Sequence, residues 1–452
     1  MSALMAEPRR NISVCTSPYT QAWMLGCSFL FTFTAYDTIQ VFAKRLYAIY
    51  GSADLGSNMT LCIYAFFTAS ELVAPALVNK LGPRVSMCCG MLCYSTLVAT
   101  GLVFFLTDGA WDWLVLLSGC VLGFGASILW TGQGRIILEY SSEVNRGSLF
   151  AIFWTLYRGA SIIGGALSFG YFSIEGNDAG SSLLFVIFLG LVVSGAFSIL
   201  LLRDPMVVNT GALTGAHVLS QSQDSWRAEA RETLRLYGTS PMLLLAGICW
   251  FCGLTEPYIL SGFTDRFFTE RATGAEMMVF FTCSVLGTWL SAGLLDSYAS
   301  RGCQDRGAIV TIAVFFVVHV LSFCCAGAVE FSTGCVPSGG WSFSDTGIAL
   351  PTMGFALWGF SDAMMNTYVS WLVGCMYPEG TEKARAIGFS KMINSGAHVY
   401  GYAVLPTHRV SGRMQFLLNV AFFAIAVITV VFVKPQAQRQ HKIRLAEAVP
   451  RQ

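Results

Sequence analysis

The sequence predicts an all-α polytopic membrane protein of about twelve transmembrane helices, built as two six-helix halves. The first observation is composition. Hydrophobic residues make up 54% of the 452 residues and charged residues only 12%, whereas a soluble domain is about one-quarter charged. The second is a series of apolar runs, each near the roughly 20 residues that a membrane-spanning helix needs. The third is an uneven distribution of Lys and Arg between alternate connections.

Twelve runs are long and apolar enough to span a bilayer. They are 22–42, 59–78, 85–106, 114–137, 149–172, 182–202, 241–263, 277–295, 308–329, 348–377, 386–405 and 416–433. The first run begins about twenty residues into the chain, and no small-residue cleavage site follows it. We therefore interpret it as a retained span rather than a removed signal peptide.

The basic residues give the orientation, because Lys and Arg are retained on the cytoplasmic side. With the N-terminus inside, eighteen Lys and Arg lie in the predicted inner segments and six in the outer loops. Three outer loops have no basic residue and carry acids instead: Asp108, Asp112, Glu175, Asp178, Glu330 and Asp345. We therefore expect both termini to be cytoplasmic.

The longest inner connection divides the chain in the middle. We expect an N-terminal half at 1–202, a cytoplasmic linker at 203–240, a C-terminal half at 241–433 and a cytoplasmic tail at 434–452. The end of the linker has helical periodicity, with Trp226, Ala230, Leu234 and Tyr237 on one face and three arginines beside it. This pattern is typical of an interfacial helix on the cytoplasmic leaflet.

The halves contain a weak internal repeat. Gly159, Gly164 and Ala166 of the fifth run correspond without gaps to Gly396, Gly401 and Ala403 of the eleventh. In the fourth and tenth runs, Gly-Phe pairs correspond at Gly123 and Gly359. Small residues allow helix backbones to approach closely in lipid, although polytopic proteins use them generally. Parallel six-helix repeats are one known layout of secondary transporters.

Four segments carry a family resemblance. They read YAFFTASELVAPALVNKLGPR from Tyr64, GFGASILWTGQGR from Gly123, NRGSLFAIFWT from Asn145 and WGFSDAMMNT from Trp358. Together they resemble the uncoordinated-ninety-three-like branch of the major facilitator superfamily, which implies the major-facilitator fold. The LGPR sequence ending at Arg84 occupies the loop-two–three motif of facilitators but lacks its usual aspartate, and Tyr368 stands where the family often has Gln.

Ionisable residues inside apolar spans are the candidate functional groups, because a charge at the bilayer centre costs about 2.5–3.5 kcal/mol on insertion scales. The candidates for substrate or coupling-ion binding are Asp37, Arg158, Glu256, Asp362, Asn366, Lys391 and His398. Those expected to gate or to have a structural polar role are Glu71, Arg84, Arg135 and Arg146. We expect Asp37 to be the counter-ion of Arg158, and Lys391 to pair with Asp362. Such pairs would either act in transport or simply hold helices together.

The aromatic residues are interpreted first as packing or lipid-facing groups. Trp111, Trp113, Trp130 and Trp341 lie at or near span ends and are typical of interfacial anchors. Trp154, Trp358 and Tyr368 lie closer in sequence to the polar candidates. The fifteen cysteines are scattered through apolar runs, so we expect neither a disulfide framework nor a metal site, including at the CxxC of Cys249 and Cys252.

Two functions follow from these observations. The first is a secondary transporter that moves a small polar solute or ion by alternating access, in which Asp37 or Glu256 couples transport to protons. The second, implied by the resemblance, is a non-transporting accessory protein that regulates an ion channel or chaperones another membrane protein. No enzyme motif, cofactor motif or nucleic-acid-binding charge is present. The bilayer is the expected environment, and plasma membrane and endomembrane are left open.

Overall fold

In the computed structural model, residues 16–49, 54–173, 182–210, 225–332, 336–337, 339–377, 380–404 and 409–448 are described. All named elements within these ranges are helices, and Phe268 and Trp341 form an isolated bridge. The predicted spans lie on α1 (Pro18–Ile49), α2 (Leu55–Ser70) with α3 (Ala74–Leu81), α4 (Pro83–Leu106), α5 (Asp112–Tyr140), α6 (Arg146–Ser173), α7 (Ser182–Ser198) with η2 (Ile199–Leu201), α10 (Ser240–Pro257) with η3 (Tyr258–Phe263) and α11 (Thr264–Phe267), α12 (Glu270–Ser300), α13 (Gln304–Phe331), α14 (Ala349–Met376), which follows η4 (Thr346–Ile348), α15 (Gly380–Ala403) and α16 (Gly412–Ala448).

Length and hydropathy support the membrane assignment. Among the described residues, seven helices are long and apolar enough to cross a bilayer, or eight if α2 and α3 form one span with a 66° bend. The other predicted spans lie on α1, α7, α14 and α15, of which α7 has only 17 residues. The last helix continues to Ala448, beyond the predicted end of its span at 433.

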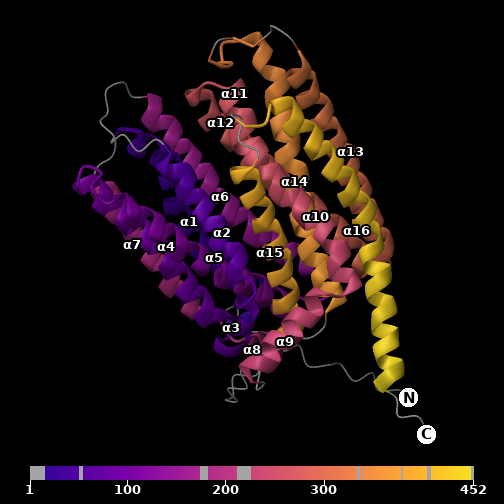
Figure 1. Ribbon diagram of the computed structural model, residues 1–452. Coiled ribbons are helices and arrows are strands. Elements are labelled where there is room, and N and C mark those ends of the chain that lie inside the picture. The colour runs from indigo at the N-terminus through magenta and orange to yellow at the C-terminus, as the bar shows by residue number, and fades with distance from the viewer. Residues whose placement is uncertain are drawn as a thin grey trace, which may run out of the picture.

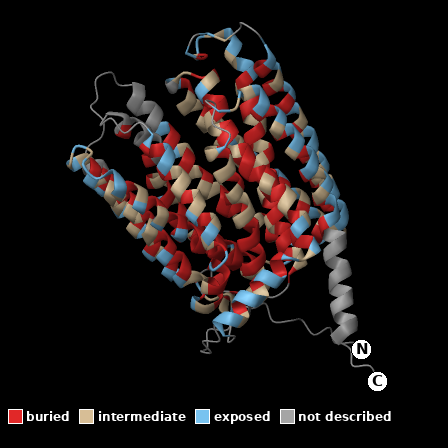
Figure 2. Ribbon diagram, in the orientation of Figure 1, coloured by how far each residue is buried: buried red, intermediate tan, exposed pale blue. Residues whose placement is uncertain are grey.

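The helices pack as two groups that meet along a shared interface (Figure 1). Helices α1, α2 and α4 to α7 pack on one another, and so do α10 and α12 to α16. The groups meet where α6 packs along α12, and where α15 packs against α2 and α5. Figure 2 shows that many exposed residues lie on outer helices such as α13 and α16, as expected for surfaces that face lipid.

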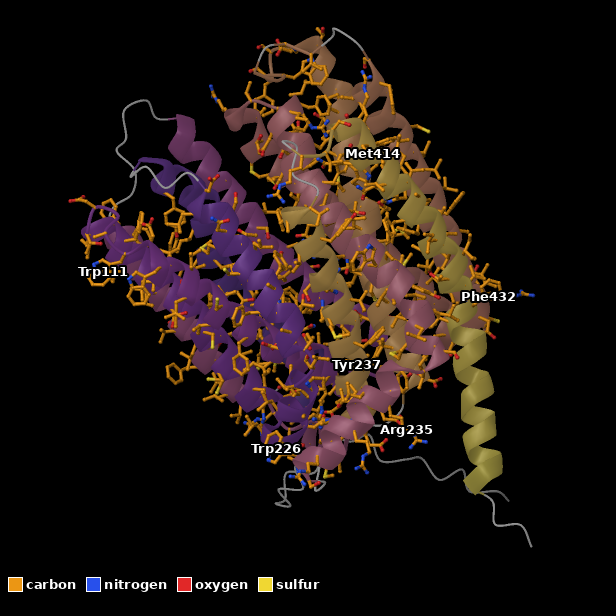
Figure 3. All side chains as sticks on the ribbon, viewed as in Figure 1. Trp111, Trp226, Arg235, Tyr237, Met414 and Phe432 are labelled. Carbon is orange, nitrogen blue, oxygen red and sulfur yellow. The ribbon has the colours of Figure 1, made fainter. Side chains whose placement is uncertain are left out.

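The predicted linker contributes α8 (Pro205–Thr210) and α9 (Trp226–Tyr237) at one end of the molecule. Helix α9 packs on α3 and α15 and buries Glu229 and Tyr237, among others, whereas Trp226, Ala230 and Leu234 are exposed. The predicted apolar face is therefore split, because Tyr237 packs against protein and the rest forms an exposed stripe. Figure 3 shows Trp226 and Arg235 at this end and Trp111 and Met414 toward the opposite end.

The start of α1 lies at the same end as α9, since Gln21 accepts a hydrogen bond from the backbone of Arg203 at 2.7 Å. That this end faces the cytoplasm stays a prediction from the basic residues. The side chains of several of these orientation signals lie outside the described residues: Lys44, Arg45, Glu175, Asp178, and the basic residues before 16 and after 433.

The repeated glycines make equivalent helix contacts in the two halves. A Cβ atom on Gly123 of α5 would lie 2.3 Å from the Ile63 carbonyl of α2, and one on Gly359 of α14 would lie 2.3 Å from the Phe280 carbonyl of α12. These are the fourth and second spans of each half. Likewise Gly164 of α6 approaches α1, and Gly401 of α15 approaches α10. The sequence repeat therefore corresponds to a repeat in packing.

These contacts predict which glycines tolerate a methyl group. Gly123→Ala and Gly359→Ala should each lower the free energy of unfolding by about 1–3 kcal/mol, because the added Cβ meets backbone that cannot move aside. The measurement is unfolding by steric trapping in lipid bicelles. Gly293→Ala in α12 is the matched control, since a Cβ there meets nothing within 4 Å. Wild-type stability of Gly359→Ala would contradict the account.

Candidate functional site

An ion pair joins the two groups of helices in the protein interior. Arg158 of α6 and Asp362 of α14 pair at 3.4 Å between Nη2 and Oδ2, and their side chains are only 10% and 17% exposed. Asn366, one turn after Asp362, donates to the same carboxylate at 3.0 Å. The expected pairing was therefore wrong: Arg158 takes the aspartate that was assigned to Lys391. The rotation of each helix about its axis decides this choice, and that rotation cannot be read from sequence spacing.

Asp37 belongs to the same region but has a different partner. Its carboxylate accepts a short hydrogen bond from the hydroxyl of Ser161, which lies one turn after Arg158 on α6. The charges of Arg158 and Glu256 act on Asp37 at longer range. Four of the predicted residues (Asp37, Arg158, Glu256 and Asp362) thus share one electrostatic environment between the halves.

Glu256 and His398 form a second pair, with 3.1 Å between Oε2 and Nε2. The other ring nitrogen of His398, Nδ1, lies 2.9 Å from the Asn394 carbonyl. A carbonyl can only accept, so Nδ1 carries a proton, and the contact of Nε2 with the carboxylate requires a further proton on one partner or the other. Tyr64 stacks on the imidazole with 4.3 Å between centroids. The His398 ring therefore links Glu256 of α10 to the backbone of α15.

The backbone beside Glu256 departs from regular helix. Pro257 ends α10, and the π-helix η3 follows directly at Tyr258–Phe263. π-helical turns inside longer helices often occur at functional sites. The Glu256 side chain is 40% exposed although His398 is 2% exposed, so the carboxylate is the accessible member of the pair.

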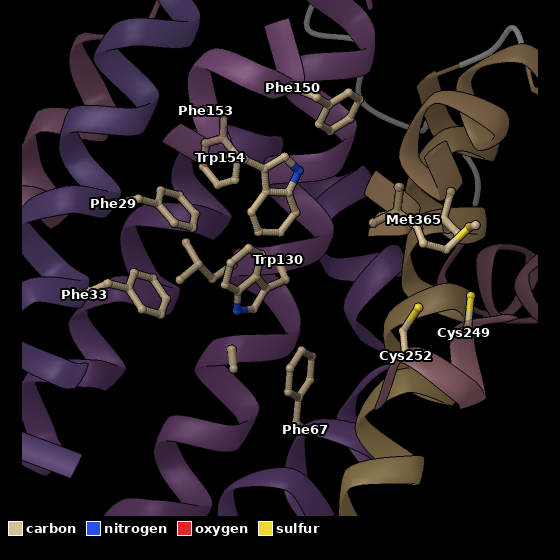
Figure 4. Packing of buried hydrophobic residues seen from close by; sticks show 14 of the residues in the cluster. Phe29, Phe33, Phe67, Trp130, Phe150, Phe153, Trp154, Cys249, Cys252 and Met365 are labelled. Atoms are coloured by element: carbon tan, nitrogen blue, oxygen red, sulfur yellow. The ribbon is translucent and has the colours of Figure 1, made fainter. Parts of the chain in front are cut away.

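Lys391 of α15 has aromatic neighbours in place of a carboxylate. Its ammonium lies 4.8 Å from the ring centroid of Trp130 and 5.8 Å from that of Trp154. No carboxylate of the described residues lies within ion-pair distance of Lys391. It lines a small cavity between the halves with Trp154, Cys249 and Cys252. Figure 4 shows Trp130 and Trp154 on helices of one half, opposite these two cysteines on the other.

The prediction of interfacial anchors was wrong for Trp130 and Trp341 and stays a prediction for Trp111 and Trp113. Trp111 and Trp113 are exposed, but Trp130 is 7% and Trp341 is 6% exposed. Trp130 is buried because α5 lies at the centre of its half, where the ring packs between Phe29 and Trp154. Of the aromatics placed near the polar residues, Trp154 lines the cavity, whereas Trp358 and Tyr368 are buried in the C-terminal half.

A polar network ties the halves together at the end where α9 lies. Glu229 of α9 is fully buried, accepts from Asn79 Nδ2 of α3 at 2.8 Å and forms an ion pair with Arg385 of α15. Arg135 of α5 donates to Asn79 Oδ1 at 2.9 Å. Arg146 reaches Cys375 Sγ of the other half at 3.1 Å. Arg135 and Arg146 therefore belong to the polar network at this end of the molecule.

A carboxylate of the C-terminal half makes further contacts between the halves at this end. Asp296 of α12 accepts from the backbone N–H groups of Gly147 and Ser148, at 2.8 and 2.7 Å, and from the Ser148 hydroxyl at 2.6 Å. These N–H groups begin α6, where a negative charge also complements the helix dipole. Asp296 thus fixes the start of the helix that carries Arg158.

Two predicted polar residues make contacts within the N-terminal half. Glu71 lies at the bend between α2 and α3, fully buried, and accepts from Thr131 at 2.9 Å. Arg84 donates to the Leu202 carbonyl at 2.8 Å and lies 3.9 Å from Asp204, so it links α4 to the chain after η2.

Several residues of this interior were missed by the sequence reasoning: Trp130, Ser161, Glu229 and Asp296. Ser161 carried a usable signal, because it lies one turn from Arg158 on the same helix face. Glu229 carried none, since an acid in an amphipathic linker is ordinarily solvated. Within the described ranges, no three His, Cys, Asp or Glu side chains gather as they would around a metal ion.

Comparison with known proteins identifies the family. The family model described as "Ion channel regulatory protein UNC-93" matches residues 56–432. The chain is 24% identical over 371 residues to UNC93-like protein 1 of Arabidopsis thaliana, covering 80% of this chain and 79% of the relative. It is 26% identical over 440 residues to UNC93-like protein MFSD11 of Xenopus laevis, covering 91% and 95%.

The fold has a counterpart among solved structures. The proton:xylose symporter XylE of the major facilitator superfamily, bound to 6-bromo-6-deoxy-D-glucose, superposes with a TM-score of 0.60 at 12% identity, over 92% of this chain and 95% of that one. The protein therefore has the major-facilitator fold in a multi-pass membrane chain, as the sequence predicted. The chain belongs to the UNC-93 family.

Proposed function

We propose that this protein is a secondary transporter that moves a small polar solute or ion by alternating access. The observation that carries the proposal is the Arg158–Asp362 ion pair, which joins the two halves inside the membrane-embedded part. Immersed charges are costly and ordinarily mark solute or ion pathways. A pair whose members belong to different halves is made or broken when the halves move relative to each other.

The distribution of polar contacts supports a two-state mechanism. Glu229, Arg385 and Asp296 tie the halves together at the α9 end. Glu256 keeps an exposed carboxylate beside its buried histidine. In alternating access, the contacts that close one end break as the other end closes. The α9 network is then the closed gate of this conformation, and Arg135 and Arg146 belong to it.

The Glu256–His398 pair supports proton coupling. It holds one proton between a carboxylate and an imidazole, and Asp37 lies within electrostatic range of Glu256. Loss of that proton would make the pair net negative and change its electrostatic interaction with Arg158 and Asp37. Movement of a proton through this pair is therefore able to bias one conformation over the other.

The family description supports a second function, that of an accessory protein for another membrane protein. An exposed stripe of Trp226, Ala230 and Leu234 on α9 offers a contact surface for either lipid or such a partner. An accessory role by itself has no need of ion pairs between the halves. For this reason we place transport first.

The ion pair predicts a specific energetic coupling. In a double-mutant cycle, Arg158→Met and Asp362→Asn should show an interaction energy of about 1–3 kcal/mol, because each single change leaves a buried charge without its partner. Unfolding by steric trapping in bicelles measures the four free energies. The cycle of Arg158→Met with Asp37→Asn is the control and should give less than about 0.5 kcal/mol. A larger interaction energy for Arg158 with Asp37 than for Arg158 with Asp362 would instead identify Asp37 as the counter-ion.

Alternating access predicts opposite motions at the two ends. Labels at 143 and 301 report on the α9 end, where Glu143 and Gln304 contact across the halves at 3.0 Å. Labels at 110 and 411 report on the far end. Double electron–electron resonance should give two distance populations at each end. Glu229→Gln should increase the population with the longer distance between labels 143 and 301, and it should decrease the population with the longer distance between labels 110 and 411. Unnatural amino acids carry the labels, because native cysteines would otherwise react.

Glu232→Gln, the same change on the same helix at a side chain that is 41% exposed, is the matched control and should leave both distributions unchanged. One fixed distance at both ends under every condition, together with one membrane protein that repeatedly co-purifies, would favour the accessory function.

A further inference from the structure

We propose that the cavity between the halves binds the negatively charged group of a small organic anion, with Lys391, Gln133 and Trp154 as its ligands. This assignment rests on the proposed transport function and specifies its substrate class. The three residues come from α15, α5 and α6, so a bound anion would contact both halves.

All three side chains present donors that lack an acceptor. Gln133 Nε2 and Trp154 Nε1 are buried nitrogen atoms with no hydrogen-bond partner among the described residues. Buried donors in native proteins are nearly always satisfied. The Nε1 atoms of Trp250 and Trp358 also have no partner among the described residues. Of these side chains, however, only Gln133 and Trp154 line the same cavity as Lys391, where one bound acceptor would lie close to all three. The Lys391 ammonium supplies three more N–H groups at the same cavity, where the rings of Trp130 and Trp154 lie beside it.

The nearby charges leave Lys391 without a local counter-ion. Glu71, Glu256 and Arg158 all act on it, but from beyond ion-pair distance. Glu71 is hydrogen-bonded by Thr131, Glu256 by His398, and Arg158 is paired with Asp362. Each of these groups thus has a partner, although Glu71 Oε1 accepts from no described residue. Lys391 has no ion-pair partner among the described residues. An anionic ligand would complete this arrangement, whereas a cationic ligand would be repelled by Lys391.

The rest of the lining selects the kind of anion. Val369 and Ile387 present apolar groups at the same cavity, and Trp154 adds a ring. The cavity is small, with room for water-sized groups rather than a large solute. Donors beside apolar walls fit a carboxylate with a short hydrocarbon tail better than a fully hydrated inorganic ion.

The test is binding of propionate to the purified full chain in lipid nanodiscs. Saturable binding should raise the unfolding temperature and change the tryptophan fluorescence, because ligand binding stabilises the native state and Trp154 lies in the site. Propionamide has the same shape without the charge and should bind at least about tenfold more weakly. Equal effects of propionamide, alanine or chloride would overturn the assignment.

Lys391→Met should weaken propionate binding by at least about tenfold. Lys80→Met is the matched control, because Lys80 also lies over a tryptophan, Trp226, but outside the cavity, and its propionate affinity should match the wild type. Gln133→Leu keeps Lys391 in place and should also weaken binding, which tests the site if Lys391→Met folds poorly. Wild-type affinity in both cavity variants would overturn the assignment.

Uptake of labelled propionate into proteoliposomes separates the two proposals. Binding that depends on Lys391 without any uptake would support the anion site and contradict transport. Uptake that is unchanged by Lys391→Met and by Gln133→Leu would support transport and contradict this site.

Discussion

The cost of placing an ionised side chain in hydrocarbon determines how the interior of this protein is arranged. Insertion of one such group costs about 2.5–3.5 kcal/mol even on the mildest scales, and several are present between the halves. The structure meets this cost by pairing Arg158 with Asp362 and Glu256 with His398, and by placing the Lys391 ammonium against tryptophan faces. Because these partners come from different helices, the charges fix how the helices are rotated and which of them meet at the centre.

Close backbone packing makes this arrangement possible. Gly123 and Gly359 bring the fourth span of each half against the second, and Gly164 and Gly401 bring the fifth against the first. Helices in lipid associate by such contacts, since there is little hydrophobic drive between them. Close contacts also occur between the halves, where a Cβ on Gly147 of α6 would lie 2.9 Å from the Ala292 Cα of α12. The bonds that Glu229 and Asp296 make across this interface are polar. Alternating access would require these polar bonds to break while the contacts within each half persist.

The helical spans were predictable from the sequence, because a run of apolar residues has one stable solution in lipid. Departures from regular helix could not be predicted from the sequence. The bend at Glu71 and the π-helix after Pro257 occur inside continuous apolar runs. The repeat of Gly123 and Gly359 was visible in the sequence, but its meaning appeared only when both glycines were found against carbonyl groups of the second span.

The candidate residues were found from sequence, but several of their partners were not. Spacing along one helix correctly placed Asn366 beside Asp362, whereas the partner of Arg158 depends on contacts between distant helices. Trp130 was assigned to the membrane surface because it lies near the end of an apolar run, yet it packs under Lys391. Glu229 was overlooked because a charge on a linker helix is ordinarily solvated, and only its contacts with Asn79 and Arg385 show that it is buried.

If the protein works by alternating access, Arg158, Asp362 and Asp37 should face water in one space between the halves. Electron cryomicroscopy of the protein in lipid nanodiscs, at a resolution that shows ordered water, tests it most directly. The account predicts Arg158 and Asp362 in contact, with ordered water beside both and beside Asp37. Lipid acyl chains against these side chains, or water-free protein separating Asp37 from the other two, would contradict it.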